Sequence, residues 1–275
     1  MITHPNVKIN LGLNVLSRRE DGYHNLETLF VPSNEFSDTL EIVCGDDYSL
    51  TVGSLDAKTT VQAISPDGKL MISISRAEGV DWNPLNDLTA KAYFLMAEEF
   101  DLPPMKIFLQ KKSPVGAGLG GGSADAAFAL RMISSLAGLE LSDEALAAYA
   151  ARLGSDCAFF IYNSPMFGSG RGEILDPFPL DISRFHIGIY IPEGISVSTA
   201  DAYRGIVPAI PEKPLREVLL QDPSTWKDEL KNDFETSVFR KYPALADIKD
   251  KLYADGALYA SMSGSGSAFF SLSYK

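Results

Sequence analysis

One stretch of the chain, residues 113–130, constrains the possible folds more than any other. It reads SPVGAGLGGGSADAAFAL, with five glycines among residues 116–122 followed by small apolar residues of helical character. Glycine allows positive φ and close backbone approach to a ligand, and a helix N-terminus presents unpaired N–H groups at the positive end of its dipole. The stretch therefore predicts a phosphate-binding loop that begins a helix running from Ser123 to about Leu136.

Two common glycine fingerprints fit this loop poorly. Gly116, Gly118 and Gly121 satisfy G-x-G-x-x-G, but the dinucleotide-binding unit requires a strand after the helix, and residues 141–154 predict a second helix instead. The Walker A pattern requires lysine where this chain has Gly122. A Rossmann oxidoreductase is therefore disfavoured, and a plain glycine-rich turn is the simpler alternative to a phosphate loop.

The charge of the chain limits what it binds. Its 275 residues include 24 Lys and Arg against 36 Asp and Glu, a formal net charge of -12. Nucleic-acid binding depends on clustered basic side chains, so a nucleic-acid partner is disfavoured. The same field repels phosphorylated small molecules, so such a ligand needs local positive groups. Lys111, Lys112 and the backbone N–H groups of the glycine loop supply them.

Cysteine and histidine are scarce in the chain. Cys44 and Cys157 lie far apart, and the histidines at positions 4, 24 and 186 complete no metal-ligand spacing with them. No apolar run reaches the length of a membrane span, and the N-terminal residues lack a signal-peptide pattern. We therefore expect a cytoplasmic protein with reduced thiols and no membrane partner.

Hydrophobic periodicity predicts an α+β fold, because strands come in blocks and helices in runs. Predicted strands, those of the first third antiparallel, cover residues 7–16, 38–45, 48–54, 69–76, 104–112, 186–191, 257–263 and 267–273. Predicted helices cover residues 86–100, capped by Asn86 or Asp87, and 141–154, capped by Ser142, and several more lie between residues 200 and 253. A short helix and a hairpin are expected within residues 155–175, with a domain boundary near residues 155–163.

Four segments together resemble the GHMP kinases, the family of galactokinase, homoserine kinase and mevalonate kinase. They are PVGAGLGGGSADAA, VKINLGLNVLSRREDGYHNLETLF, LGSDCAFFIYNSPMFGSGRGE and MSGSGSAFFSL, and the match spans the chain in order. The doubled glycine before Ser123 and the Tyr23-His24 pair are similar to one branch. Members of that branch phosphorylate the 2-hydroxyl of a cytidine diphosphate-linked methylerythritol in the non-mevalonate isoprenoid pathway. The resemblance implies two domains: residues 1–158 of the ribosomal protein S5 domain 2-like type, and a ferredoxin-like α/β domain over residues 159–275.

The resemblance assigns phosphoryl transfer to Lys8 and Asp156. It implies that Asp156 takes the proton of the substrate hydroxyl, while Lys8 keeps that carboxylate ionised and orients the hydroxyl. From the residues alone, Asp156 has a commoner role as a helix cap. Lys8 is either solvent-facing, the default for lysine, or directed into a cleft, and Asn10 on the same strand face favours the cleft.

The resemblance also implies a nucleobase pocket for the substrate. His24 would hydrogen-bond the cytosine, Tyr23 would stack on it, and Thr199 and Tyr203, which share a face if their segment is helical, would complete the pocket. Near the transferred group it places two glycines of the C-terminal loop, Gly264 and Gly266, for which an ordinary hairpin turn is an equally good interpretation from sequence. Asn10 is expected to contact the substrate.

ATP is the phosphoryl donor that the family implies, with Mg²⁺ expected beside it and no metal ligand identifiable. The predicted ATP-binding residues are Lys111, Pro114, Gly116, Gly118, Leu119, Gly120, Gly121, Gly122, Ser123 and Asp87. Two positions depart from the family pattern. Ala124 stands where many members have a second serine, and Asp87 stands where the family has an asparagine near the adenine.

Two other functions stay open at this point. A GHMP kinase for another alcohol, of the homoserine or mevalonate type, would have no nucleobase to place between Tyr23 and Tyr203. A non-catalytic nucleotide-binding relative would be free to lose Lys8 or Asp156, and the presence of both favours an enzyme.

Overall fold

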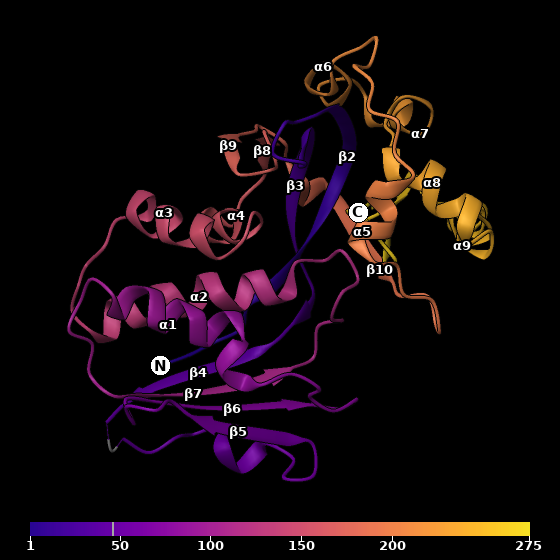
Figure 1. Cartoon of the computed structure of the whole chain (residues 1–275). Helices are drawn as coiled ribbons and strands as arrows, with labels where there is room; N and C mark the ends of the chain where they lie inside the picture. Colours follow the sequence, from indigo (N-terminus) through magenta and orange to yellow (C-terminus); the bar gives the residue numbers. More distant parts are fainter. Residues whose placement is uncertain (46) are drawn as a thin grey trace. The chain divides into compact units, whose positions relative to one another are not determined.

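The computed structural model describes residues 1–45 and 47–275, which form two compact units (Figure 1). The first unit comprises residues 1–7, 36–114 and 120–163, and the second comprises residues 8–35, 115–119 and 164–275. Each unit is therefore assembled from separate stretches of the chain. The family-domain division at residues 158 and 159 stays a prediction.

A five-stranded sheet forms the base of the first unit. Its strands, in spatial order, are β1 (Ile2–Thr3), β4 (Thr39–Cys44), β7 (Met105–Lys111), β6 (Leu70–Arg76) and β5 (Thr60–Ile64). Every neighbouring pair is antiparallel except β6 and β7, which are parallel. The strands predicted over residues 38–45, 69–76 and 104–112 are confirmed.

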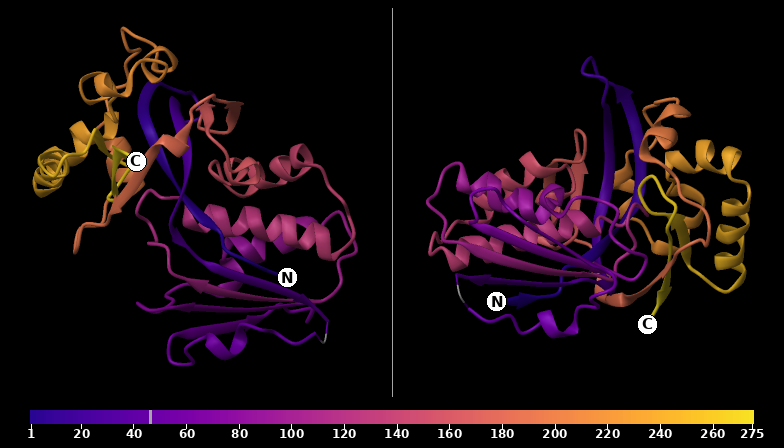
Figure 2. Two further views of the ribbon diagram at one scale, coloured as in Figure 1. Left: turned by 180° about the vertical axis from the view of Figure 1, so that it is seen from behind. Right: turned by 60° about the horizontal axis from the view of Figure 1, so that its bottom comes forward.

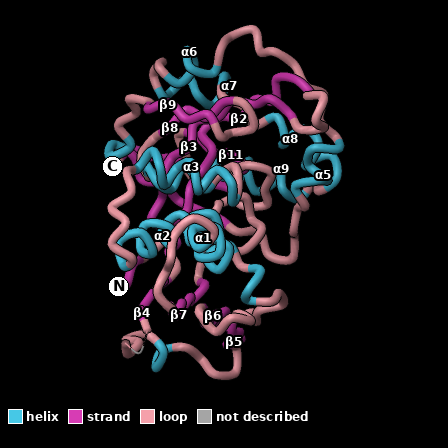
Figure 3. Tube along the Cα trace, turned by 60° about the vertical axis from the view of Figure 1, so that its left-hand side comes forward, coloured by secondary structure: helices cyan, strands magenta, loops and turns pink. Residues whose placement is uncertain are grey.

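Four helices complete the first unit: α1 (Leu88–Ala97), α2 (Gly121–Leu136), α3 (Asp143–Leu153) and α4 (Cys157–Tyr162). Helices α1 and α2 lie together over one face of the sheet (Figures 1 and 3). Alanines on α2 are fully buried, and such small side chains allow close helix packing. The predicted caps are confirmed, because the Asp87 side chain accepts from Thr89 N–H and the Ser142 side chain from Ala145 N–H.

The second unit contains two sheets. One has the order β2 (Asn6–Arg18), β3 (His24–Ser37), β8 (Met166–Ser169) and β9 (Ile174–Pro177), in which β2 and β3 form a long hairpin (Figure 2). The other is antiparallel, with the order β10 (Phe185–Tyr190), β12 (Phe269–Tyr274) and β11 (Tyr259–Met262). Strand β3 was not predicted, because Pro32 and polar neighbours interrupt its alternation.

The helices of the second unit are α5 (Thr199–Arg204), α6 (Leu215–Leu219), α7 (Trp226–Glu229), α8 (Asp233–Lys241) and α9 (Ala244–Ala254). One buried cluster joins β2 to α5, α8 and the closing strands through side chains that include Val15, Phe234, Val238 and Phe269. In the described residues of the two units, 3₁₀ helices lie at Val52–Ser54, Pro84–Asn86, Ile182–Arg184 and Pro223–Thr225. In the described part of the chain, none of the helices has both the length and the apolar character that crossing a membrane requires.

The strand predicted over residues 48–54 is wrong. The segment is a loop ending in a 3₁₀ turn, and the buried Glu41 carboxylate holds it by accepting from Ser49 Oγ, Leu50 N, Thr51 N and Thr51 Oγ1. These local side-chain hydrogen bonds offer the backbone an alternative to a strand ladder.

A substitution at Trp226 would test the packing of the second unit. Its indole is fully buried, contacts Phe185 and Tyr259, and donates from Nε1 to the Val218 carbonyl at 3.2 Å. Trp226→Phe should lower the free energy of unfolding by about 2 kcal/mol, because a buried carbonyl loses its donor and a small cavity forms. Urea unfolding measures the loss. A change no larger than that of the half-buried Trp82→Phe would contradict this packing.

Candidate active site

Lys8 is buried in the second unit. Strand alternation places Lys8, Asn10 and Gly12 on one face of β2. The lysine is only 3% exposed, and its Nζ donates to Asn10 Oδ1 at 2.5 Å and to the Gly118 carbonyl at 3.0 Å. Its backbone N–H donates to the carbonyl of Leu119 at 2.9 Å. The solvent-facing alternative for Lys8 is therefore wrong.

Asn10 is oriented by the neighbouring strand. Its Nδ2 donates to Thr28 Oγ1 at 3.1 Å, and the Thr28 hydroxyl donates to the Gly12 carbonyl at 2.6 Å. With Nδ2 engaged by β3, the amide oxygen faces Lys8. The Lys8 ammonium thus has a defined position, as a group acting on a reacting oxygen requires.

The middle of the phosphate loop contacts the C-terminal glycine loop, residues 263–268, within the second unit. Ser263 Oγ donates to the Gly118 carbonyl at 3.1 Å, and Ala268 N–H donates to the Ala117 carbonyl at 3.1 Å. Gly118 has φ +80°, and a Cβ built on it would lie 2.2 Å from the Ser263 carbonyl oxygen. Only glycine fits here.

Gly264 brings the C-terminal glycine loop close to Lys8. A Cβ built on Gly264 would lie 3.2 Å from Asn10 Oδ1 and 3.6 Å from Lys8 Nζ. Gly266, the other predicted glycine, has φ +87°, and its Cβ would meet the Met262 sulfur at 2.5 Å. The structure thus brings Lys8, Asn10, Gly118 and Gly264 together.

The start of α2 belongs to the first unit and is built from three glycines. Gly120 is the N-cap residue, with φ 73°, and no side chain caps the helix. A Cβ on Gly121 would lie 2.3 Å from Ser113 Oγ, whereas Gly122 is exposed. An uncapped first turn with accessible backbone is suited to an anion, so the residues present fit the phosphates of ATP.

Lys111 lies beneath this turn in a buried ion cluster. Its Nζ donates to Asp38 Oδ2, to Asp125 Oδ2 at 2.6 Å and to Ser113 Oγ at 3.2 Å, and the side chain is 4% exposed. All three ammonium hydrogens therefore have acceptors. Direct contact between Lys111 and a phosphate stays a prediction, and it would require the lysine to give up one of these partners.

Asp38 anchors the chain on the N-terminal side of the loop. Its Oδ1 accepts from the backbone N–H groups of Lys112 and Ser113 at 2.6 and 2.7 Å, and its Oδ2 accepts from Ser113 Oγ at 2.7 Å. Burial opposes ionisation of Asp38, but the Lys111 ammonium and these donors hold the pKa of the carboxyl below its usual value. Neither Asp38 nor Asp125 is among the residues predicted from the sequence.

Asp156 lies in the first unit at the beginning of α4. It occupies the N-cap position, but its side chain makes no capping hydrogen bond, so the structure does not support the capping alternative. The next residue, Cys157, is buried and hydrogen-bonded to Ser123 at the start of α2. Burial raises the pKa of the Cys157 thiol to about 12. Asp156 is therefore next in sequence to a residue bonded to Ser123, and its pairing with Lys8, which belongs to the second unit, stays a prediction.

Aromatic side chains gather at the start of β3 and on α5. The His24 and Tyr203 rings stack with centroids 5.0 Å apart, and burial together with the Arg18 charge lowers the pKa of His24. Tyr23 is 57% exposed, with the Arg171 guanidinium 5.0 Å from its ring centroid. In this structure His24, rather than Tyr23, lies against Tyr203, so a base held between the two tyrosines stays a prediction.

Thr199 connects this aromatic group to the C-terminal glycine loop. Its Oγ1 lies 3.1 Å from Ser265 Oγ, the residue after Gly264. One loop therefore touches Lys8 and Asn10 through Gly264 and the Thr199–Tyr203 helix through Ser265.

Asp87, a predicted adenine contact, is occupied by local hydrogen bonds. Its Oδ1 accepts from Thr89 N–H and Oγ1 at 2.9 and 2.7 Å, and its Oδ2 accepts from Trp82 Nε1 at 3.2 Å. The structure shows Asp87 as a helix cap, and its contact with adenine stays a prediction.

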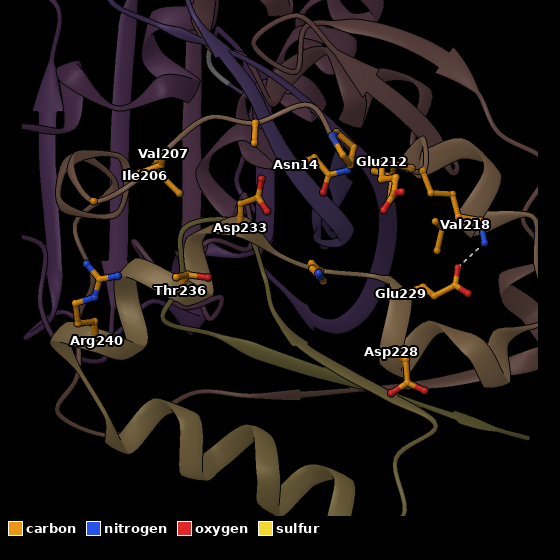
Figure 4. A pocket seen from close by; sticks show the side chains of 16 residues that line it. Asn14, Ile206, Val207, Glu212, Val218, Asp228, Glu229, Asp233, Thr236 and Arg240 are labelled. Atoms are coloured by element: carbon orange, nitrogen blue, oxygen red, sulfur yellow. Dashed lines mark hydrogen bonds and ion pairs between the residues drawn. The ribbon is translucent and has the colours of Figure 1, made fainter.

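A cavity of about 580 Å³ lies elsewhere in the second unit (Figure 4). Its wall includes Asn14, Asp233, Thr236 and Arg240, and none of the predicted site residues lines it. Across residues 1–45 and 47–275, His, Cys, Asp and Glu side chains form no cluster of three or more that could hold a metal ion.

Comparison with known proteins decides the family. Residues 87–164 match the model of the GHMP kinases N terminal domain, and residues 212–275 match that of the GHMP kinases C terminal. A protein of Bacteroides fragilis named 4-diphosphocytidyl-2-C-methyl-D-erythritol kinase is 45% identical over 272 residues, covering 99% of this chain and 92% of its own. The chain belongs to the GHMP kinase family. It is thus an ATP-dependent small-molecule kinase, and the α+β GHMP fold expected from sequence is confirmed.

Solved structures agree with this GHMP kinase assignment. The crystal structure of a 4-(cytidine 5'-diphospho)-2C-methyl-D-erythritol kinase matches with a TM-score of 0.77 at 31% identity, covering 99% of this chain and 90% of that one. The homoserine kinase of Cytophaga hutchinsonii matches with a TM-score of 0.65 at 17% identity, over 98% of this chain and 85% of that one, and shows the shared fold alone.

Two glycines of the loop provide a matched test. Gly118→Ala should destabilise the kinase strongly or abolish turnover, since its Cβ would overlap the Ser263 carbonyl oxygen. Gly116 also has positive φ, +72°, but no atom lies within 4 Å of a Cβ there, so Gly116→Ala should cost only about 1 kcal/mol of backbone strain. Thermal unfolding compares the two variants, and equal losses would contradict the tight contact at Gly118.

Asp125 gives a pH-dependent prediction. Burial raises its pKa well above the usual value, although Lys111 lowers it, and its Oδ1 is buried without a hydrogen-bond partner. A raised folded-state pKa means that stability is present at low pH and is lost as pH rises through that value. Asp125→Asn should therefore melt a few degrees above wild type at pH 8, about 1–2 kcal/mol, and this advantage should shrink toward pH 5.

The exposed Asp101→Asn is the control for Asp125→Asn. It should leave the melting curve unchanged at both pH values. An Asp125→Asn protein that melts below wild type at pH 8 would show that the Lys111 ion pair outweighs the cost of burying the second carboxylate.

Proposed function

We propose that this GHMP kinase transfers the γ-phosphoryl group of ATP to the 2-hydroxyl of 4-diphosphocytidyl-2-C-methyl-D-erythritol, a step of non-mevalonate isoprenoid biosynthesis. Besides the similarity to kinases named for this substrate, one structural observation supports the proposal. The C-terminal glycine loop approaches Lys8 at Gly264, where an added Cβ would lie 3.6 Å from the lysine Nζ, and it contacts Thr199 of α5 through Ser265. A substrate that lies along this loop has its acceptor hydroxyl at the lysine end and a flat ring at the aromatic end.

The length of this arrangement favours a nucleotide-linked alcohol. A small acceptor such as homoserine would occupy the Lys8 end and leave His24 and Tyr203 without a role. A cytosine can stack on these rings and accept or donate hydrogen bonds along its edge. The diphosphate of the substrate would then lie along a glycine-rich backbone whose N–H groups suit anions.

The glycine loop and the start of α2 are proposed to hold the ATP phosphates. The uncapped first turn offers N–H donors, and Gly120 to Gly122 keep side chains out of their way. Mg²⁺ is proposed to enter with ATP and to neutralise charge on the transferred group. Its coordination would come mainly from phosphates and water, since the described side chains offer no cluster of ligands.

Asp156 and Lys8 are proposed to divide the chemistry. Asp156 would accept the proton of the substrate 2-hydroxyl as the hydroxyl oxygen attacks the γ-phosphorus of ATP. The Lys8 ammonium would stabilise negative charge on the reacting oxygens. Asp156 directly precedes Cys157, which is hydrogen-bonded to Ser123, and this supports the role, because the hydroxyl must meet the phosphoryl group at that end of the loop.

Turnover with and without the cytidine substrate tests the proposal. ADP release from magnesium-ATP should depend on 4-diphosphocytidyl-2-C-methyl-D-erythritol, and Asp156→Asn should lower kcat by about 10²–10⁴-fold, since a positioned base contributes that much. Asp143→Asn, another aspartate at a helix start in the first unit, is the control and should keep wild-type turnover. Wild-type activity on homoserine or mevalonate alone would sink the substrate assignment, and ATP binding without turnover on any alcohol would favour a non-catalytic protein.

A further inference from the structure

Residues 231–235 join two parts of the second unit that carry predicted site residues. On one side, the Lys231 carbonyl accepts from Leu13 N–H at 2.8 Å, and Asp233 Oδ2 accepts from Val15 N–H at 2.7 Å. Both donors belong to β2, the strand that carries Lys8 and Asn10. The segment is thus hydrogen-bonded along the edge of the strand that bears the reactive lysine.

On the other side, Asn232 holds the C-terminal glycine loop. Its Nδ2 donates to the Met262 carbonyl at 2.7 Å and to the Gly264 carbonyl at 2.8 Å. Its Oδ1 accepts from Phe234 N–H at 3.0 Å and so caps α8. With the side chain 2% exposed, both amide hydrogens and the amide oxygen have partners inside the protein.

Only an amide of this length satisfies these contacts. Two carbonyl oxygens require two donors, and the α8 N-terminus requires an acceptor, which together exclude a carboxylate, a hydroxyl or an ammonium at this position. Asn232 therefore sets the distance between the Gly264 carbonyl and the segment bonded to β2. Because Gly264 lies against Lys8 and Asn10, a displacement of this loop would change the surroundings of the lysine directly.

We propose that Asn232 is a positioning residue of the phosphoryl-transfer site. It holds the C-terminal glycine loop in the position from which Gly264 and Ser265 contact the substrate. The inference rests on the proposed function for the identity of the substrate. It adds a residue that touches neither reactant and acts through Gly264.

Asn232→Ala gives the first test. Removing the two donors should lower kcat about 30-fold with the cytidine substrate, while KM for ATP changes less than about threefold, because the loop would be displaced and the first turn of α2 would be unaffected. Tyr253→Phe is the matched control, because it also removes one donor from a backbone carbonyl, that of Ala260 in β11, which is outside the glycine loop. It should lose stability but keep kcat within about twofold.

Asn232→Asp gives a readout that a merely structural role would not produce. The ionised carboxylate would face two carbonyl oxygens without a hydrogen to donate, so kcat at pH 8 should fall below that of Asn232→Ala. Near pH 5.5 the carboxyl gains a proton, which restores one donor, and kcat relative to wild type at the same pH should rise at least tenfold. Charged groups on its own segment are Lys231, Asp233 and Glu235. Lys249 of α9 is paired with Glu235, and Lys8 lies beyond Gly264.

These experiments distinguish failure of the positioning role of Asn232 from failure of the proposed function. Equal loss of kcat in Asn232→Ala and Tyr253→Phe, or a flat ratio of Asn232→Asp to wild type between pH 8 and 5.5, would overturn the positioning role. If Asn232→Ala does not fold, the pH ratio for Asn232→Asp decides alone. If wild type phosphorylates a different alcohol, the substrate assignment falls, but the comparison is made on that alcohol and still tests Asn232.

Discussion

The carbonyl of Gly118 is the contact on which the second unit's part of the site depends. It accepts from Lys8 Nζ and from Ser263 Oγ, so one oxygen joins strand β2, the glycine loop before α2 and the C-terminal glycine loop. The three segments come from the beginning, middle and end of the chain. The lack of a side chain at position 118 permits this, because any Cβ would overlap the Ser263 carbonyl oxygen. Close packing therefore requires a glycine here, whether or not a nucleotide also contacts the loop.

A different interaction organises the first unit's part of the site. Asp38 holds the residues before the phosphate loop, and Lys111 connects it to Asp125 on the helix after the loop. Burial raises the pKa of Asp125 well above its usual value, and the nearby Asp38 carboxylate, which shares the same lysine, adds to this rise. In a protein of net charge -12, the positive field that we propose for ATP would therefore come from backbone N–H groups.

The sequence predicted features of the site that depend on neighbouring residues better than contacts between residues far apart in the chain. The uncapped glycine start of α2 and the buried position of Lys8 beside Asn10 followed from spacing and strand alternation. The partners of Lys111 could not be found this way, because Asp38 is 73 residues away and nothing in its neighbourhood marks it. Asn232 was not predicted either, because its donors reach carbonyls 30 and 32 residues further on. In the fold, the loop over residues 48–54 was mistaken for a strand because its hydrogen bonds go to the Glu41 side chain.

The central claim is that Lys8 and Asp156, which belong to different units, act in the same chemical step. A double-mutant cycle of Lys8→Ala and Asp156→Asn, measured as kcat/KM for phosphorylation of 4-diphosphocytidyl-2-C-methyl-D-erythritol, tests it most directly. Residues that act as a unit are strongly non-additive, so the double variant should be no more than about threefold worse than the poorer single variant. Losses that multiply across the two substitutions would show independent roles and contradict the account.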